Sequence, residues 1–240
     1  MEGSHYQLHK MIGMRKKHPK ILLLYILFGF GGLWHMLNWF QPAMRILASP
    51  LIIGISLVLV HEGFLSLSNV YKNRYFLWCI TIFLGGFGME VLGVHTRFPF
   101  GHYQYGQVLK PQIFEVPIAI GFAWLLICLS SYMLACRITL RLTMKNDYHN
   151  ILIPFITAVF MVFFDLIMEI AAPGLGYWHW TSQTVPVRNY LSWFVLGMLF
   201  SWLGLKLNIT FKLDSALGMH VYISQMIYFI LSLFKSARVL

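Results

Sequence analysis

Long apolar runs follow one another along the whole chain and are separated by short polar segments. A helix needs about 20 mostly apolar residues to cross the hydrocarbon core of a bilayer. Seven segments meet this requirement, at about 20–40, 49–69, 75–95, 113–136, 151–171, 190–207 and 215–234. The pattern therefore predicts an all-α, polytopic bundle of about seven transmembrane helices, forming a single integral membrane domain over residues 1–240.

The composition excludes several other classes of protein. Of the 240 residues, 58% are hydrophobic and only 11% are charged, whereas about 25% of the residues of a soluble domain are charged. A disordered chain and a disulfide scaffold are excluded as well. The cysteines Cys79, Cys128 and Cys136 lie in or beside apolar runs without C-x-x-C spacing, so we expect small buried hydrophobes.

The net charge of +10 indicates orientation rather than nucleic-acid binding, because basic loops of membrane proteins face the cytoplasm. With the N-terminus inside, twelve basic residues lie on the inner side: Lys10, Arg15, Lys16, Lys17, Lys20, Lys72, Arg74, Arg137, Arg141, Lys145, Lys206 and Lys212. Six lie on the outer side: Arg45, Arg97, Lys110, Arg188, Lys235 and Arg238. We therefore expect a multi-pass protein of the cell (cytoplasmic) membrane, with a basic cytoplasmic segment over 1–19. The first apolar run is too long for a signal peptide, so we expect it to be an anchored helix.

Acidic residues occur where an apolar segment should exclude them. Five of the eight lie inside or at the ends of predicted spans: Glu62, Glu90, Glu115, Asp165 and Glu169. A charged carboxylate at the centre of a membrane helix costs about 2.5–3.5 kcal/mol, which favours a functional role. Asp165 and Glu169 share one helix face because they are four residues apart. With Glu90 and Glu115, they predict four carboxyl groups at one depth near the outer surface.

Structural roles are the alternative for every one of these groups. The alternative partners are loop backbone for Glu90 or Glu115, Arg97 or Arg188 for Asp165 and Glu169, and His61 for Glu62. A lone histidine on an apolar helix is usually a hydrogen-bonded core residue, which we predict for His61 and His220. No histidines lie at matched depth as metal ligands, and the His-rich clusters of membrane di-iron enzymes are absent. We therefore expect no metal and no cofactor.

The two longest outer loops, about 96–112 and 172–189, are rich in aromatic rings, glycine and proline. Their rings are Phe98, Phe100, Tyr103 and Tyr105 in the first loop and Tyr177, Trp178 and Trp180 in the second. Such loops tend to carry function or to fold back. An interfacial belt is the ordinary explanation for aromatic residues, and we expect it for Trp39 and Trp78. Rings beside buried acids instead suit a cationic ligand or a carbocation.

Spaced motifs occupy the same two regions. Residues 86–124 contain E-x-x-G, P-F-G-x-Y and V-P-x-x-x-x-x-x-W, at Glu90–Gly93, Pro99–Tyr103 and Val116–Trp124. Residues 165–194 contain D-x-x-x-E, Y-W-x-W, V-P-x-x-N and W-F, at Asp165–Glu169, Tyr177–Trp180, Val185–Asn189 and Trp193–Phe194. These motifs resemble the signature of the carotenoid biosynthesis membrane-protein family. That family includes membrane-type carotenoid 1,2-hydratases, such as gamma-carotene and bisanhydrobacterioruberin hydratases. The chain departs from it at Arg97, where glycine is usual, and at Ile170, where proline is frequent.

The resemblance implies addition of water to the terminal 1,2 double bond of a linear or monocyclic carotene. Its partners would be the lipid-soluble carotenoid, membrane lipid and other carotenoid-pathway enzymes, and not nucleic acid. Alkene hydration needs a carboxyl group that keeps its proton and a second one that orients water. We predict Asp165 as the acid, with Glu90 or Glu169 handling water. The predicted substrate-binding residues are Phe100, Tyr103, Tyr177, Trp178, Trp180 and Asn189.

Three other functions suit the same residues. Carotene cyclisation begins with the same protonation, but an internal double bond captures the cation. A proton-coupled transporter also uses buried acids, although the chain lacks the internal repeat that many transporters have. A carotenoid-binding subunit for neighbouring enzymes would keep the aromatic rings but has no need of paired carboxyl groups.

Overall fold

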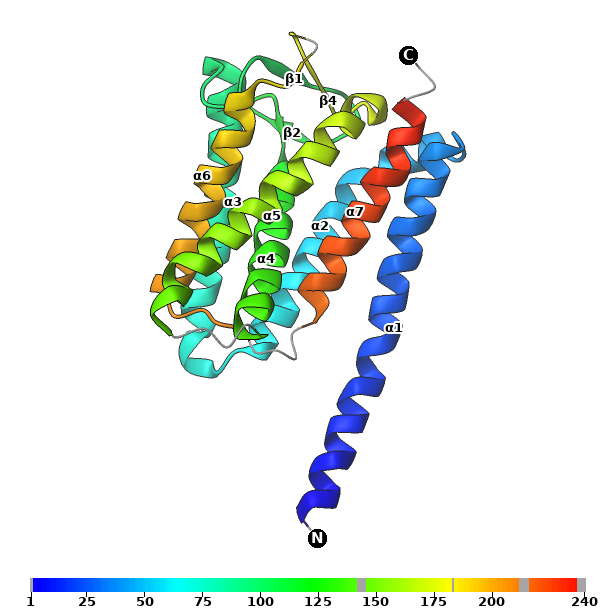
Figure 1. Ribbon diagram of the computed structural model, residues 1–240. Coiled ribbons are helices and arrows are strands. Elements are labelled where there is room, and N and C mark those ends of the chain that lie inside the picture. Colours follow the sequence, from blue (N-terminus) through cyan, green and yellow to red (C-terminus); the bar gives the residue numbers. More distant parts are fainter. Residues whose placement is uncertain (1, 142–145, 183, 212–215, 237–240) are drawn as a thin grey trace.

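A bundle of helices makes up most of the computed structural model, which describes residues 2–141, 146–182, 184–211 and 216–236 (Figure 1). The helices in this part of the chain are α1 (Glu2–Met36), α2 (Gln41–Ser66), α3 (Asn69–Thr96), α4 (Ile118–Arg141), α5 (Asn146–Leu175), α6 (Val187–Lys206) and α7 (Leu217–Ser236). Each contains most or all of one of the predicted apolar segments. The prediction of an all-α bundle with seven helices is confirmed.

Six of these helices are long and apolar enough to cross a membrane, and α6 is the exception. Helix α6 has 20 residues, as α7 does, but Arg188, Asn189 and Lys206 lie near its ends and lower its hydropathy. It nevertheless packs along α5 within the bundle (Figure 1). By length and composition, six of the about seven expected spans qualify among the described residues, and the seventh is a more polar helix packed beside them.

A short hairpin delays the start of α4, which we expected at about residue 113. Strands β2 (Gln112–Ile113) and β3 (Val116–Pro117) pair antiparallel. Their turn is formed by Phe114 and Glu115, whose φ angles of 53° and 63° are uncommon for residues other than glycine. Glu115 is exposed in this turn. The expectation that it joins the other carboxyl groups is wrong, because hydropathy does not detect the turn.

The two aromatic loops fold back and pair with each other. Strands β1 (Tyr103–Tyr105) and β4 (Trp178–Trp180) form a two-stranded antiparallel ribbon. This β-ribbon covers one end of the bundle, where α1 is linked to α2 and where α5 ends (Figure 1). It joins segments that are 75 residues apart in sequence and fixes the end of α3 relative to that of α5.

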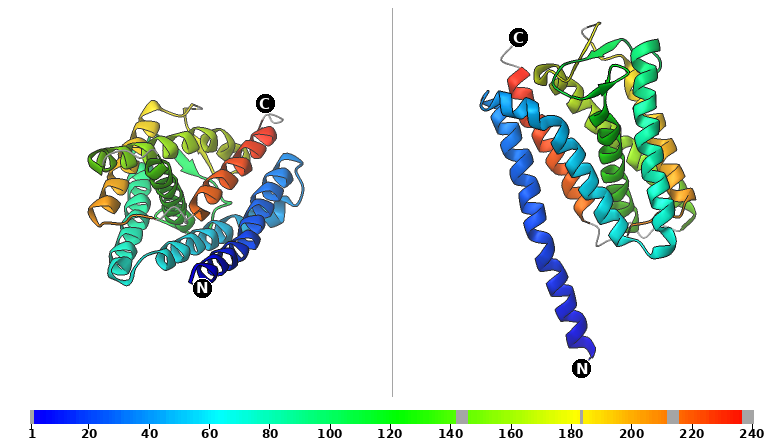
Figure 2. Two further views of the ribbon diagram at one scale, coloured as in Figure 1. Left: turned by 60° about the horizontal axis from the view of Figure 1, so that its bottom comes forward. Right: turned by 180° about the vertical axis from the view of Figure 1, so that it is seen from behind.

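The basic residues divide between the two ends of the bundle as expected. Lys72, Arg74, Arg141 and Lys206 lie at helix ends away from the β-ribbon, whereas those near the ribbon end include Arg45, Arg97, Arg188 and Lys235. The start of α1 and the end of α7 lie at opposite ends of the molecule (Figures 1 and 2). Lys145, Lys212 and Arg238 lie outside the described residues. Which end faces the cytoplasm stays a prediction.

Two expectations about polar and aromatic residues are corrected. His61 is exposed and is not a core residue. Its neighbour Glu62 accepts a hydrogen bond from Lys20 Nζ at 2.5 Å in a surface ion pair between α2 and α1. Trp78 is fully buried and donates to the Phe200 carbonyl at 2.7 Å, whereas Trp39 is exposed as an interfacial belt requires. The three cysteines are buried and form no disulfide, as expected.

Close packing of α3 against α4 depends on Gly86. A Cβ atom added at Gly86 would lie 2.4 Å from Cγ of Trp124. The Trp124 ring also stacks on Trp193 of α6, with ring centroids 4.1 Å apart. Any side chain at position 86 must therefore displace a ring that is packed on both sides.

We predict that Gly86→Ala lowers the free energy of unfolding by about 1–3 kcal/mol, because overpacking forces Trp124 to shift. Gly88→Ala is the matched control, since nothing lies within 4 Å of a Cβ atom at Gly88 in the same helix. Thermal unfolding of the purified protein in detergent compares the two variants. Equal midpoints would contradict this prediction, because they would show that the Trp124 ring shifts without loss of stability.

Candidate active site

The β-ribbon presents one face to the bundle and one to its surroundings. Side chains alternate along a strand, and the inward positions are occupied by Tyr103 and Tyr105 of β1 and by Trp178 and Trp180 of β4. The outward residues Gln104 and His179 are exposed. Tyr103 lies opposite Trp180, with ring centroids 5.0 Å apart. The pairing register therefore collects four hydrogen-bond donors beneath the β-ribbon.

Glu90 of α3 accepts hydrogen bonds from three side chains at this end of the bundle. Tyr103 and Tyr105 both donate to its Oε2, the latter at 2.7 Å. Trp124 Nε1 donates to its Oε1 at 2.9 Å. Burial, and then the neighbouring Glu90 carboxyl group, raise the pKa of the Tyr103 phenol well above its usual value, so Tyr103 keeps its proton and acts as a donor. Both oxygens of Glu90 thus accept hydrogen bonds from fixed groups.

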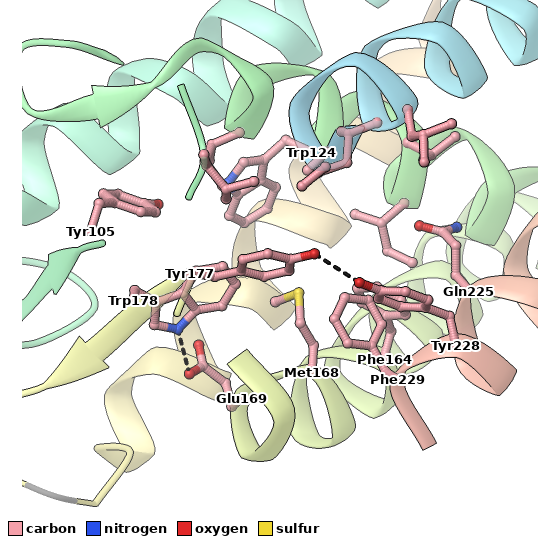
Figure 3. Close-up of a pocket in the computed structure, with 18 of the residues that line it drawn as sticks. Tyr105, Trp124, Phe164, Met168, Glu169, Tyr177, Trp178, Gln225, Tyr228 and Phe229 are labelled. Atoms are coloured by element: carbon pink, nitrogen blue, oxygen red, sulfur yellow. Dashed lines mark hydrogen bonds between the residues drawn. The ribbon is translucent and has the colours of Figure 1, made fainter. Parts of the chain in front are cut away.

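Glu169 of α5 is bound by the other strand. Trp178 Nε1 donates to Glu169 Oε2 at 2.9 Å, and Trp180 Nε1 donates to the same oxygen at 2.7 Å. Figure 3 shows the Glu169 side chain pointing toward Trp178 at one side of a cavity. Its Oε1 receives no hydrogen bond from the described residues. One oxygen of Glu169 is therefore available to carry a proton.

Asp165 lies one turn before Glu169 and is completely buried. Its Oδ2 accepts a hydrogen bond from Asn189 Nδ2 at 2.7 Å, and its Oδ1 is buried without a partner among the described residues. The alternative in which Arg97 or Arg188 pairs with these acids is wrong. Both arginines are exposed, and the two acids accept hydrogen bonds from Asn189, Trp178 and Trp180 instead.

A cavity of about 1220 Å³, its open part included, extends from these groups into the bundle (Figure 3). Glu90 and Glu169 line it. So do all six predicted substrate-binding residues, Phe100, Tyr103, Tyr177, Trp178, Trp180 and Asn189. Asp165 does not line the cavity and reaches it only through Asn189. Most other lining residues are apolar, which is typical of a site for a hydrophobic ligand.

Sequence reasoning missed several residues of the cavity wall. Tyr105 and Trp124 donate hydrogen bonds to Glu90. Both lie within the motif-bearing residues 86–124 but were not predicted as site residues. Tyr228 of α7 forms a hydrogen bond with Tyr177 at 2.8 Å between the hydroxyl groups, visible across the cavity in Figure 3. Burial raises the pKa of Tyr177 to about 12, so this phenol stays neutral. A tyrosine within the apolar run of α7, such as Tyr228, carries no sequence signal that points to a site.

The arrangement favours proton transfer in an apolar cavity. Glu90, Asp165 and Glu169 are buried, and a buried carboxyl group without a cation favours its neutral form. Neighbouring carboxyl groups also titrate as a set, so that one holds a proton while another is ionised. No three histidine, cysteine or acidic side chains within the described ranges are grouped as a metal site requires.

Comparison with known proteins places this site in a family. The family model of carotenoid biosynthesis proteins matches residues 43–237, which is more than half of the chain. The matched region includes Glu90, Asp165 and Glu169 and the side chains that donate hydrogen bonds to them. The chain belongs to the carotenoid biosynthesis protein family. The family resemblance inferred from the spaced motifs is thereby confirmed.

One curated relative in this comparison is the bisanhydrobacterioruberin hydratase of Haloarcula japonica. It is 26% identical over 129 residues, which are 52% of this chain and 43% of that protein. The match thus spans less than half the length of the relative. No solved structure matches the chain.

The donors from the β-ribbon generate a prediction about stability. We expect Tyr103→Phe to lower the free energy of unfolding by about 1–3 kcal/mol, because a buried carboxyl group loses a hydrogen-bond donor. Gln104→Ala changes the adjacent outward side chain and should alter stability by less than about 0.5 kcal/mol. Thermal unfolding in detergent measures both variants. Equal midpoints would show that the hydrogen bond from Tyr103 to Glu90 does not contribute to the stability of the fold.

Proposed function

We propose that this family member is a carotenoid hydratase of the cell membrane, which adds water to the terminal 1,2 double bond of a linear or monocyclic carotene. The observation that carries the proposal is the contrast between Glu90 and Glu169 on one apolar cavity. Glu90 accepts hydrogen bonds at both oxygens, whereas Glu169 has one oxygen without a donor among the described residues. Membership of the carotenoid biosynthesis protein family supports a role in that pathway, and similarity to the Haloarcula japonica hydratase favours hydration.

In the proposed reaction, Glu169 is the general acid. The proton on its Oε1 passes to the less substituted carbon of the terminal double bond, whose π electrons form the new C–H bond. The other carbon becomes a tertiary carbocation. Glu169 is left ionised, and the indole N–H groups of Trp178 and Trp180 already stabilise its Oε2. This assignment replaces Asp165 as the acid, because Glu169 lines the cavity and Asp165 does not.

Capture of the cation requires a water molecule and an acceptor for its proton. A water oxygen bonds to the cationic carbon and loses one proton to a carboxylate, which restores the acid and gives a tertiary alcohol. Glu90 supplies fixed negative charge near the cation, and the indole faces add cation–π stabilisation. Asn189 donates its amide N–H to Asp165, which leaves its carbonyl oxygen to accept a hydrogen bond from the water. Asp165 is then a positioning residue.

Pigment analysis tests the proposed reaction. The protein is produced in a bacterial host that accumulates lycopene or gamma-carotene, and the pigments are separated by chromatography and weighed by mass spectrometry. We expect a more polar product that is heavier by one water, about 18 mass units. An isomer of unchanged mass contradicts hydration and indicates cyclisation. Unchanged pigment beside membrane-inserted protein contradicts both and favours a transporter or a binding subunit.

Substitution of the carboxyl groups tests the assigned roles. We expect Glu169→Gln to lower the hydration rate by about 10²–10⁴-fold, the range that a general acid contributes. Glu90→Gln should also lower it, and Asp165→Asn less so, because Asp165 acts through Asn189. Glu115→Gln is the matched control, since Glu115 is exposed in the β2–β3 turn. Wild-type rates in all three site variants would refute the mechanism.

A further inference from the structure

The cavity extends well beyond the carboxyl groups, into an apolar arm that the proposed chemistry does not use. The arm is formed by the lining residues of α1 and α2, which are Leu27, Phe28, Gly31, Met44, Ala48, Leu51, Ile52 and Ile55. None of these side chains is polar. The arm therefore suits a hydrocarbon chain rather than water or a polar metabolite.

Burial changes along the cavity. At the β-ribbon end, Phe100 is 1% exposed and Trp180 is 8% exposed, so this end is closed. In the apolar arm, Leu27 is 41% exposed although it lines the cavity. Ile52 and Ile55 are half-buried. Leu27 therefore borders both the cavity and the surface of the molecule, which brings the apolar arm to the surface on the α1 side.

The position of this opening along the helices places it within a bilayer. Leu27 is nine residues before the end of α1 at Met36, which corresponds to about 14 Å at 1.5 Å per residue. Ile55 is fourteen residues after the start of α2 at Gln41, or about 21 Å. The hydrocarbon core of a bilayer is about 30 Å thick. The opening thus faces acyl chains and not water.

The packing of the helices keeps the apolar arm open. Helix α1 packs mainly along α7 and α2 mainly along α4, and the two helices diverge from their link at the β-ribbon end (Figure 2). Small residues line the arm at Gly31 and Ala48. A Cβ atom at Gly31 would lie 3.3 Å from the Tyr228 ring, so even a methyl group there narrows the space beside α7.

We propose that the apolar arm is a lateral entrance, through which a polyene chain passes from the bilayer between α1 and α2. This inference rests on the proposed function for the identity of the ligand. The terminal double bond lies at Glu169, and the remaining chain occupies the arm and continues into the membrane. Access from the bilayer suits a carotene, because the β-ribbon closes the opposite end of the cavity and the ligand is dissolved in hydrocarbon.

A block in the apolar arm should slow the reaction of a long substrate but not that of a short one. Ala48→Phe introduces a ring into the arm, and Leu47→Phe is the matched control because Leu47 is 44% exposed and does not line the cavity. The purified variants are given a linear carotene and a short alkene with the same end group. We expect Ala48→Phe to slow hydration of the carotene about tenfold or more, as filling an apolar pocket does. The short alkene should react at nearly the wild-type rate.

Retention of the carotene provides a readout that does not depend on catalysis. Glu169→Gln protein is purified from a host rich in lycopene, with and without Ala48→Phe, and bound pigment is measured by visible absorbance per protein. We expect the second substitution to remove most of the pigment, and Leu47→Phe to remove none. If wild-type protein forms no hydrated product but this difference persists, the proposed function fails while the lateral entrance stands.

Two results would overturn the lateral entrance. One is equal retention of pigment with and without Ala48→Phe in folded protein. The other is an equal loss of activity toward the long and the short substrate, since a block in the apolar arm acts only on a chain that must occupy it. Ile52→Trp makes the same block from a half-buried position and replaces Ala48→Phe if that variant does not fold.

Discussion

A carboxyl group inside a membrane bundle must find its hydrogen-bond donors within the protein, because acyl chains supply none. Glu90 and Glu169 meet this constraint through the β-ribbon, whose two strands each serve one of them. The antiparallel register between Tyr103 and Trp180 fixes the donors relative to each other. The pairing thereby links the ends of α3 and α5 on either side of the cavity.

The same donors distinguish the two carboxyl groups chemically. Phenol and indole groups donate to both oxygens of Glu90, and such hydrogen bonds stabilise a carboxylate when it is ionised. Among the described residues, Glu169 has donors on one oxygen only, which leaves the other for a proton. A pair of acids with different surroundings is the usual basis for separate acid and base roles. Asp165 does not line the cavity, and it positions Asn189, which donates to it and does line the cavity.

Hydropathy and spacing predicted the helices, the shared face of Asp165 and Glu169, and the position of both aromatic loops beside the carboxyl groups. The pairing of those loops could not be predicted, since three-residue strands 75 residues apart carry no periodic signal. Glu115 was misplaced because its turn depends on backbone conformation and not on apolar content. The apolar arm was invisible for a different reason: residues such as Ala48 and Ile52 have the same character whether they face lipid, core or cavity.

The proposed reaction needs a hydrocarbon and water to meet at one carbon atom, and the two ends of the cavity differ in the way this requires. The apolar arm has no polar side chain and opens at the depth of acyl chains. The carboxyl groups and Asn189 lie together at the β-ribbon end, where they can hold a water molecule, whereas Gln225 of α7 is a separate polar group on the cavity wall. A cation formed at this boundary is surrounded by rings and reached by water from one side only. Because the carboxyl groups and the water lie together at one end, the reaction is directed to the terminal double bond and the rest of the polyene is kept away from the acid.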